Sequence, residues 1–405
     1  MSTTLSAVRV TDHVYWVGAV DGQLRDFHGY STERGSSYNA FLVMGDAPVL
    51  IDTVKAPFMD EMMARIASVC PPETIDRIVS NHSEMDHTGC LPEVIARVRP
   101  REVLASKNGV AALSAHFGAL DDVRAVADGE RIDVGGLTLS FYETRMLHWP
   151  DSMVTYLAED KLLFSQDAFG MHLASTERFD DALDRAVLEF EAGKYFANIL
   201  MPYAGIIPRA LAKLSALEFS IIAPDHGPVW RRDPRWILDA YARWSEQAPT
   251  RKAVIVYDTM WESTAVMAQT IADGIEAGGA EPKLMRLSEH TRAEVATELL
   301  EAGSLVVGSP TLNNGVFPTV ADVLTYLKGL RPKNLVGAAF GSYGWSGEAV
   351  EQLNEYLRAM KVALVSDGLK VAYVPGDEDL EACHRLGRTI GAAVLERAHA
   401  EHRAL

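Results

Sequence analysis

The feature that most constrains the fold of this chain is the strict alternation of short apolar runs with amphipathic segments over roughly its last 150 residues. The apolar runs predict strands at residues 253–257, 283–287, 304–308, 334–340 and around 371. The segments between them predict helices at residues 264–277, 293–302, 320–327, 348–360 and from 380 onward. Strands that alternate with helices in this way predict a doubly wound, five-stranded parallel sheet.

The preceding part of the chain mixes strands and helices without that regularity. Strands are predicted at residues 14–20, 37–44, 47–53, 76–81, 102–105, 137–143 and 220–223, and helices at 57–69, 91–98 and 109–117. Hairpin turns are predicted at Gly45-Asp46 and, within residues 153–164, at Glu159-Asp160. The polar run WSEQAPTRK at 244–252 contains a proline, which is typical of a linker. We therefore expect one mixed α/β domain over residues 1–248 and a second domain over 252–405.

Composition excludes several classes of function. Lys and Arg total 38 against 55 Asp and Glu, and the formal net charge of −17 would repel a nucleic-acid backbone. The three cysteines, Cys70, Cys90 and Cys383, form no CxxC pair, which excludes a disulfide framework and an all-cysteine metal or iron–sulfur site. The N-terminal stretch lacks the features of a signal peptide, and no run approaches the ~20 apolar residues of a membrane span. We expect a cytoplasmic protein without nucleic-acid or membrane partners.

The most informative segment is NHSEMDHTG at residues 81–89, directly after a predicted strand. It contains four side chains that can bind a metal: His82, Glu84, Asp86 and His87. The alternation of the first three places them on one side of an extended segment. Imidazole and carboxylate ligands without thiolate suit iron, manganese or zinc. The alternative is a polar loop whose histidines are buried and hydrogen-bonded.

Three further candidate ligands each follow a predicted strand: His148 in MLHWPDS, Asp167 in FSQDAFG and His226 in APDHGPVW. Sites in α/β proteins form where strand ends meet at one edge of a sheet. Taken singly, each of the three is an ordinary structural residue. Their order and spacing relative to residues 82–87 favour one shared metal site.

The pattern His82-x-Glu84-x-Asp86-His87, followed by single His, Asp and His residues, resembles the metallo-β-lactamase superfamily, whose first motif is HxHxDH. The glutamate in place of the middle histidine adds a hard oxygen donor, which favours iron over zinc. Together with RDFHGY, MLHWPDSM and GSYGWSGE, the pattern resembles the flavodiiron proteins over the length of the chain. The rubredoxin:oxygen oxidoreductases are the most similar subgroup.

The resemblance implies an αββα metallo-β-lactamase-like sandwich followed by a flavodoxin-like domain. It implies one iron held by His82, Glu84 and His148, a second held by Asp86, His87 and His226, and a bridge between them through Asp167. It also implies that Tyr195 and His28 lie near the open face of the iron pair as catalytic-pocket residues. His172 is a further candidate for that pocket, and a plain core role is the alternative for each of the three.

The loops after the first, third and fourth predicted strands of the second domain are rich in hydroxyl-bearing and small residues. The first loop lacks GxGxxG and GK[ST], yet its hydroxyls and the N–H groups of the following helix can hold a phosphate. This resembles the way flavodoxins bind FMN. Small residues in the other loops let the backbone approach a planar ring, on which a tryptophan can stack. The predicted FMN-binding residues are Thr259, Met260, Trp261, Ser263, Thr264, Ser309, Pro310, Thr311, Asn313, Asn314, Gly315, Gly341, Ser342, Tyr343, Gly344 and Trp345.

We therefore expect a rubredoxin-dependent reductase of dioxygen or nitric oxide, in which FMN passes electrons to a non-haem iron pair. The alternatives are a zinc hydrolase with an appended flavodoxin module, against which Glu84 argues, and a non-catalytic flavin electron carrier, against which the full ligand set argues. The lack of a nicotinamide fingerprint implies an outside donor, either rubredoxin or a similar small carrier, with reduced deazaflavin as the competitor. We expect the carrier to dock on an apolar patch around Tyr343 and Trp345 with basic residues at its rim. The resemblance further implies a head-to-tail homodimer or a dimer of dimers.

Overall fold

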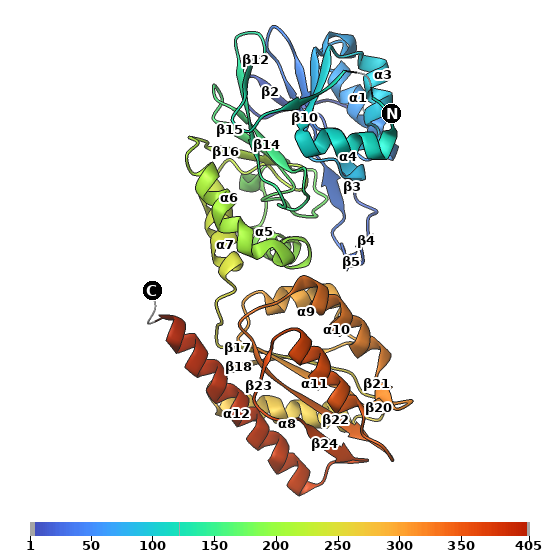
Figure 1. Cartoon of the computed structure of the whole chain (residues 1–405), viewed down its shortest axis with the longest axis vertical. Helices are drawn as coiled ribbons and strands as arrows, with labels where there is room; N and C mark the ends of the chain where they lie inside the picture. The colour runs from blue at the N-terminus through green and yellow to red at the C-terminus, as the bar shows by residue number, and fades with distance from the viewer. Residues whose placement is uncertain (1–4, 121, 403–405) are drawn as a thin grey trace. The chain divides into compact units, whose positions relative to one another are not determined.

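The computed structural model describes residues 5–120 and 122–402 and separates into two compact units (Figure 1). The first unit comprises Met1–Tyr195 and Ile206–Ala242, and the second comprises Phe196–Gly205 and Arg243–Leu405. The first four residues of the N-terminal stretch considered above lie outside the described residues. Within the described ranges no helix has both the length and the apolar character needed to cross a membrane.

A seven-stranded sheet organises the first unit, in the order β1-β2-β7-β8-β9-β10-β11. The neighbours from β1 to β8 are antiparallel, and those from β8 to β11 are parallel. The hairpin predicted at Gly45-Asp46 is confirmed as the turn between β7 and β8. The strands span Val8–Arg9 (β1), Val14–Trp16 (β2), Phe41–Val43 (β7), Val49–Ile51 (β8), Arg77–Ser80 (β9), Glu102–Ser106 (β10) and Val123–Val126 (β11).

A second sheet of five strands follows in the order β12-β13-β14-β15-β16, and it is antiparallel except for the last pair. The predicted hairpin over residues 153–164 is confirmed as β14 and β15. These strands span Arg131–Asp133 (β12), Thr138–Glu143 (β13), Met153–Leu157 (β14), Leu162–Gln166 (β15) and Ile221–Pro224 (β16).

Two predicted strands of the first unit are divided in the structure. The segment 14–20 forms β2 and then β3 (Ala19–Asp21), and the segment 37–44 forms β6 (Ser36–Tyr38) and then β7. β3 pairs with β6 outside the main sheet, whereas β2 pairs with β7 inside it. β3 and β6 continue the chain directions of β2 and β7 but, among the described strands, pair only with each other. The apolar pattern in the sequence therefore runs past the point at which the main sheet ends. The same excursion carries the short ribbon of β4 (Asp26–Phe27) and β5 (Tyr30–Ser31).

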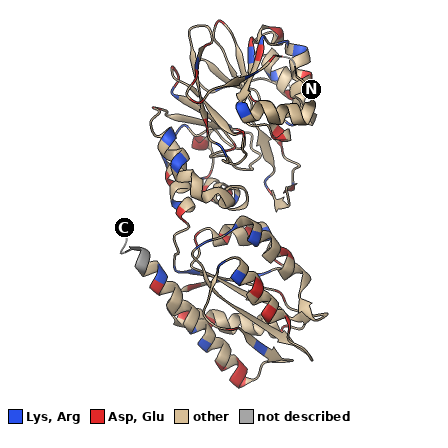
Figure 2. Ribbon diagram, in the orientation of Figure 1, with Lys and Arg blue, Asp and Glu red and all other residues tan. Residues whose placement is uncertain are grey.

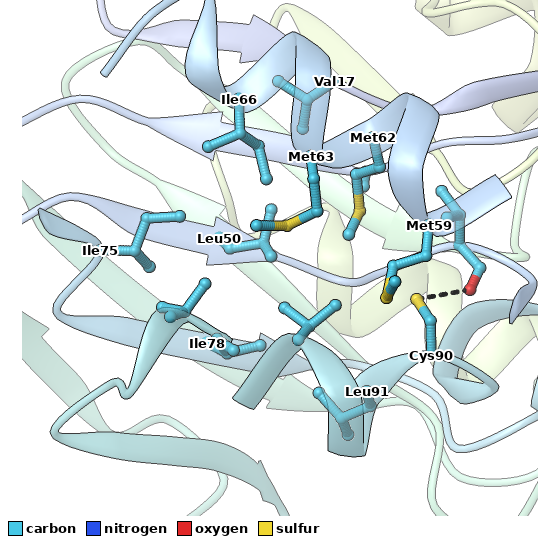
Figure 3. Packing of buried hydrophobic residues seen from close by; sticks show 14 of the residues in the cluster. Val17, Leu50, Met59, Met62, Met63, Ile66, Ile75, Ile78, Cys90 and Leu91 are labelled. Atoms are coloured by element: carbon cyan, nitrogen blue, oxygen red, sulfur yellow. Dashed lines mark hydrogen bonds between the residues drawn. The ribbon is translucent and has the colours of Figure 1, made fainter. Parts of the chain in front are cut away.

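Alternate residues of the seven-stranded sheet face different cores, as the period of two in a strand requires. Leu50 and Ile78 pack with the apolar residues of α1 (Met59–Ala67), α3 (Leu91–Val98) and α4 (Lys107–Phe117). Figure 3 shows part of this core, in which the Cys90 Sγ donates a hydrogen bond to a backbone carbonyl. Ile51 and Val79 face the second sheet instead. Burial on both faces explains why β8 is a continuous apolar run and why the two central residues of β9, Ile78 and Val79, are both apolar.

Four helices of the first unit were not predicted: the one-turn α2 (Met85–Thr88), α5 (Arg185–Tyr195), α6 (Ile207–Leu214) and α7 (Pro234–Glu246). Between α5 and α6 the backbone passes through a π-helix, Phe196–Leu200, and a 3-10 helix, Met201–Ile206. The changes of helical type blur the 3.6-residue period in this part of the sequence. Because α7 extends to Glu246, the linker predicted at 244–252 begins later than expected. Trp244, which was expected in the linker, is a buried residue of the last turn of this helix.

The second unit contains the doubly wound parallel sheet that the sequence predicted, in the order β18-β17-β19-β22 with a divided fifth strand. Every pair in it is parallel. Two short strands, β23 and β24, occupy the fifth position and pair with opposite ends of β22. They are separated by the turn residues Ser366, Asp367 and Gly368, of which Gly368 has a φ of +98°. The strands span Lys252–Tyr257 (β17), Glu281–Arg286 (β18), Ser304–Gly308 (β19), Val336–Tyr343 (β22), Ala363–Leu364 (β23) and Leu369–Ala372 (β24).

Helices cover both faces of this sheet. On one face α8 (Ser263–Ala277) and α12 (Asp377–His402) pack against apolar residues of β17, β19 and β22. On the other face lie α9 (Arg292–Leu299), α10 (Pro318–Leu330) and α11 (Ala349–Ala359) (Figure 1). Figure 2 shows the charged residues gathered on helices and loops, whereas the central strands β19 and β22 contain none. The carboxyl ends of these strands therefore form the polar edge at which a ligand can bind.

Candidate metal centre and flavin pocket

The seven predicted metal ligands converge at the strand ends of the first unit. The segment after β9 leads into the one-turn helix α2 (Met85–Thr88) and supplies four of them. His148 lies in the loop between β13 and β14, Asp167 directly follows β15, and His226 lies two residues beyond β16. All seven are buried except His148, which is half-buried. Both sheets thus contribute ligand-capable side chains to one place.

The first group consists of His82, Glu84 and His148, together with Asp167, and their ligand atoms all lie within 4.8 Å of one another. The Nε2 of His82 is 3.1 Å from Oε2 of Glu84, and the Nε2 of His148 is 3.3 Å from the same oxygen. Two imidazole nitrogens and a carboxylate oxygen that face one point form a donor set suited to a divalent transition metal.

Asp86, His87 and His226 form the second group. The Nε2 of His226 is 3.2 Å from Oδ2 of Asp86 and 3.2 Å from the Nε2 of His87. Both carboxylate oxygens of Asp86 are buried, and neither has a hydrogen-bond partner among the described residues. A buried carboxylate without a donor is costly unless a cation occupies the space that it faces. This group therefore fits a metal ion on chemical grounds.

Asp167 lies between the two groups and presents a different oxygen to each. Its Oδ2 is 2.9 Å from the Nε2 of His148 and 3.3 Å from that of His82, whereas its Oδ1 is 3.3 Å from the Nε2 of both His87 and His226. Burial acts to raise the pKa of Asp167, but hydrogen bonds from His148, His82 and His87 hold this pKa well below its usual range. One ionised carboxylate can thus hold two metal ions close together, the geometry used for two-centre chemistry.

Two carboxylates that the sequence analysis missed lie behind the histidines. The Nδ1 of His82 is 3.7 Å from Oδ1 of Asp151, and the Nδ1 of His87 is 3.7 Å from Oδ2 of Asp225. The Nδ1 of His226 is 2.7 Å from the Ser37 carbonyl oxygen. The hydrogen bond to the Ser37 carbonyl fixes the His226 ring, whereas the two carboxylates lie at ion-pair distance, beyond hydrogen-bonding range. Both carboxylates stand beside ligands in the motifs WPDS and PDHG, which is the signal that could have found them.

The three predicted pocket residues also lie beside the cluster. His28 is exposed, and its Nε2 is 2.7 Å from Oε1 of Glu84. His172 is buried, with its ring centroid 4.6 Å from that of His226 and its Nδ1 2.8 Å from the Ser36 hydroxyl. The Tyr195 ring is buried with its centroid 5.2 Å from the centroid of His172. Burial and the nearby charge of His226 lower the pKa of His172 well below its usual range, so this ring is neutral. The catalytic roles of His28 and Tyr195 stay predictions.

A pocket of about 540 Å³ lies at the carboxyl edge of the sheet in the second unit. Eleven of the predicted FMN-binding residues line it: Met260, Trp261, Ser263, Pro310, Thr311, Asn313, Asn314, Ser342, Tyr343, Gly344 and Trp345. Four residues that were not predicted line it too: Leu312, Ser346, Tyr373 and Val374. The last two follow β24, so the rule that ligands bind at the carboxyl ends of parallel strands could have identified them.

The other five predicted FMN residues, Thr259, Thr264, Ser309, Gly315 and Gly341, do not line the pocket. The Thr264 and Ser342 hydroxyls are 2.8 Å apart and join two of the loops, and the Ser309 hydroxyl accepts a hydrogen bond from the backbone of Phe317. Gly341 and Gly315 complete the same loops. The Thr259 hydroxyl is buried and has no hydrogen-bond partner among the residues that the structure describes. That free hydroxyl, together with the first N–H groups of α8, fits the phosphate of FMN.

Comparison with known proteins matches both units to families. Residues 36–227 match the ODP family beta lactamase, and residues 255–387 match flavodoxin. A nitric oxide reductase of Moorella thermoacetica is 46% identical over 395 residues, which cover 96% of this chain and 99% of that protein. The solved structure of a rubredoxin oxygen:oxidoreductase from Desulfovibrio gigas has a TM-score of 0.95 and 41% identity, covering 97% of this chain and 99% of that one. The flavodiiron protein from Giardia intestinalis has a TM-score of 0.95 and 33% identity, covering 99% of both chains. These matches confirm the predicted fold class of a metallo-β-lactamase-like sandwich followed by a flavodoxin-like sheet.

Proposed function

This chain belongs to the flavodiiron proteins, and from that membership we propose that it reduces dioxygen to water, nitric oxide to nitrous oxide, or both, with two irons and FMN as cofactors. The observation that carries the proposal is the position of Asp167, whose two oxygens face two separate groups of histidine and carboxylate side chains. Neither a plain electron carrier nor a one-metal site requires that arrangement.

The proposed ligands form two groups, one for each iron. His82, Glu84 and His148 would hold one iron, Asp86, His87 and His226 the other, and Asp167 both. The loops after β17, β19 and β22, together with Tyr373 and Val374, would hold FMN. When bound, the iron pair and the flavin supply the electron transfers that gas reduction requires.

The chain itself contributes position and selectivity. We propose that Asp151 and Asp225, each with a carboxylate oxygen 3.7 Å from Nδ1 of His82 or His87, attract these rings and help to direct their Nε2 atoms at the cluster. We propose that exposed His28, bonded to Glu84, lies at the entrance, and that buried Tyr195 closes the interior side of the pocket. Since nearly all of the ligand side chains and Tyr195 are buried, the site has room for a small diatomic gas but not for a polymeric substrate.

The test is a metal analysis combined with gas consumption. Protein expressed with ample iron should contain two irons per chain, and the anaerobically reduced protein should consume O2, NO or both. Asp86→Asn and His226→Ala should each lose one metal and nearly all gas reduction, while the FMN spectrum stays intact. His13→Ala is the matched control, because His13 is half-buried, pairs with Asp160 and belongs to neither group of proposed ligands. Zinc near two and iron near zero would contradict the proposal and favour a hydrolase.

We also propose a head-to-tail homodimer in which the flavin of one copy serves the irons of the other. The proposed metal site and the flavin pocket belong to different compact units of the chain. Because electron transfer requires cofactors to be close, a second copy that supplies its flavin to these irons would meet this requirement. Mixing copies carrying His226→Ala with copies carrying Gly341→Val tests this directly. Each variant should be inactive alone, and exchange of subunits should restore activity. Mixed dimers that remain inactive would refute the arrangement.

Rubredoxin is the donor that we propose. Exposed apolar side chains surround the flavin pocket, among them Trp261 and Trp345, both 89% exposed, and Tyr373, and such a patch suits a small protein carrier. Stopped-flow mixing with reduced rubredoxin should reduce the flavin faster than NADH does. Faster reduction by a reduced deazaflavin would replace rubredoxin as donor.

Two smaller expectations accompany the proposed function. We propose domain limits at residues 1–248 and 252–405, in keeping with the family matches over residues 36–227 and 255–387. We also propose a cytoplasmic location, which the three buried, unpaired cysteines support, since a reducing compartment keeps thiols free.

A further inference from the structure

A second pocket of the first unit, of about 420 Å³, is lined by none of the proposed metal ligands. It lies between β2, α1 and the segment that leads away from the metal cluster after His172. Its lining combines one aromatic ring, two guanidinium groups and three hydroxyls, which belong to Trp16, Arg65, Arg178, Ser6, Ser175 and Thr176.

The two arginines crowd the same tryptophan. The guanidinium carbon of Arg178 is 4.5 Å from the centroid of the Trp16 ring, and that of Arg65 is 4.9 Å from it. Arg178 is only 8% exposed and Arg65 only 9%. Burial first, and then the charge of Arg65, lowers the pKa of Arg178 to about 10. Two buried cations therefore stand close enough to disfavour each other.

Neighbouring carboxylates neither neutralise these two guanidinium groups nor satisfy all of their hydrogen-bond donors. One nitrogen of Arg65 pairs with Glu61 at 2.6 Å, but its Nε is buried and has no hydrogen-bond partner among the described residues. The guanidinium of Arg178 makes no hydrogen bond or ion pair within residues 5–120 and 122–402. Glu177 and Glu61 act on it only at longer range. A buried guanidinium usually has an anionic partner, and a cation–π contact replaces that partner only in part.

We propose that this pocket binds the phosphate group of a small molecule or inorganic phosphate. The planar fork of a guanidinium matches phosphate oxygens two at a time. Arg178 supplies a free fork and Arg65 adds a second positive charge. The hydroxyls of Ser6, Ser175 and Thr176 line the pocket together with the apolar side chains of Val8, Val20 and Ala174. A phosphate offers oxygens in several directions at once, whereas a planar carboxylate offers two in one plane. The class that fits best is therefore a tetrahedral oxyanion.

The floor of the pocket is held in place before any ligand arrives. The Nε1 of Trp16 donates a hydrogen bond of 2.8 Å to Oδ1 of buried Asn39, which fixes the ring over which both guanidinium groups lie. A pocket of about 420 Å³ exceeds the size of one phosphate ion. The remaining space accommodates the rest of a phosphorylated small molecule, so both the free ion and an ester are candidate sources of the group.

Titration calorimetry on the iron- and FMN-loaded full chain tests the proposal with three probes: inorganic phosphate, glycerol phosphate and acetate. Phosphate or its ester should bind the wild type, and Arg178→Gln should weaken this binding at least about tenfold through the loss of a charged hydrogen-bonding partner. Arg178→Lys, which keeps the charge but not the fork, should fall between the two. Arg131→Gln, at an exposed arginine of the same unit, should bind like the wild type.

The outcomes separate the alternatives. Tighter binding of the ester than of the ion assigns the pocket to a phosphorylated small molecule, and equal binding assigns it to the phosphate group alone. Acetate bound as tightly as phosphate would overturn the assignment to a tetrahedral oxyanion. Absence of binding, or an unchanged affinity in Arg178→Gln, would overturn the site itself and leave the two arginines as structural partners of Trp16. Unaltered iron and FMN content establishes that each variant is folded. Since none of the three probes reports on gas reduction, the result is independent of the proposed activity.

Discussion

Asn39 offers the sharpest test of how the first unit holds its metal loop, because one buried side chain satisfies three groups at once. Its Oδ1 accepts from the Trp16 Nε1 at 2.8 Å, and its Nδ2 donates to the carbonyls of Pro224 at 2.7 Å and Gly227 at 2.9 Å. The two carbonyls flank His226, one of the proposed ligands. Asn39→Ala removes all three bonds while leaving the backbone able to keep its conformation.

The expected cost follows from those three bonds. A buried polar group that loses its partner costs about 1–3 kcal/mol, so three such groups set a range of roughly 3–9 kcal/mol. The space that the shorter side chain leaves is polar and admits a water, which restores part of the bonding. We therefore expect a loss of about 3–5 kcal/mol in the unfolding free energy of the first unit.

Urea unfolding measures this loss, with tryptophan fluorescence reporting on the whole chain and flavin fluorescence reporting on the second unit. The flavin transition should stay unchanged, the remaining transition should move to lower urea, and iron content should fall because the loop around His226 is loosened. Asn108→Ala is the control, since Asn108 is only half-buried and its side chain makes one bond, to the Pro150 carbonyl at 2.9 Å. An Asn39→Ala loss no larger than that of the control would refute the reasoning.

Two further changes test other parts of the molecule. Hydrogen bonds from Arg77 and Arg124 outweigh the effect of burial and lower the pKa of Glu102, so its ionised form stabilises the fold above the usual Glu pKa of about 4.3 and loses that effect as the pH falls through the lowered value. Glu102→Gln should therefore be less stable than the wild type at neutral pH, with a difference that shrinks in acid. A thermal-melting difference that is constant with pH would contradict this. Gly341→Ala places a Cβ 2.1 Å from the Ser309 carbonyl oxygen and should abolish FMN retention, measured by the flavin content after purification. Gly329→Ala, whose Cβ meets nothing within 4 Å, should retain FMN.

Periodic parts of the chain were predictable from sequence, and parts whose conformation depends on distant contacts were not. The sheet of the second unit followed from alternation, and α3 was predicted at the bounds that it has, Leu91–Val98. α5 and α6 escaped because π- and 3-10 turns lie between them and interrupt the helical period. α7 is regular and was missed because its last residues were interpreted as a linker. β11 and β12 were missed because they are short and partly exposed, so they lack a clear apolar run.

In the candidate site, too, the residues of a local motif were predictable and those that depend on distant contacts were not. His82, Glu84, Asp86 and His87 were found because four ligand types crowd one motif of the sequence. Asp151 and Asp225 were missed although they stand in the same motifs as His148 and His226, because the sequence does not show which ring a carboxylate will face. The phosphate pocket around Trp16 was not predicted for the same reason: its arginines are far apart in sequence and meet only through packing.

The fifth strand of the second unit is divided into β23 and β24, so the part beside the flavin pocket can open without breaking the pairing at the other end of β22. β24 is four residues long, pairs only with β22 among the described strands, and ends beside Tyr373, whose N–H donates to the Tyr343 carbonyl. β23 holds the other end of β22 independently. A short edge strand opens locally at a lower free energy than the whole sheet unfolds. We therefore expect the amide hydrogens of β24 to exchange earlier than those of β19, and the wall of the pocket to open for a flavin while the core beneath it stays closed.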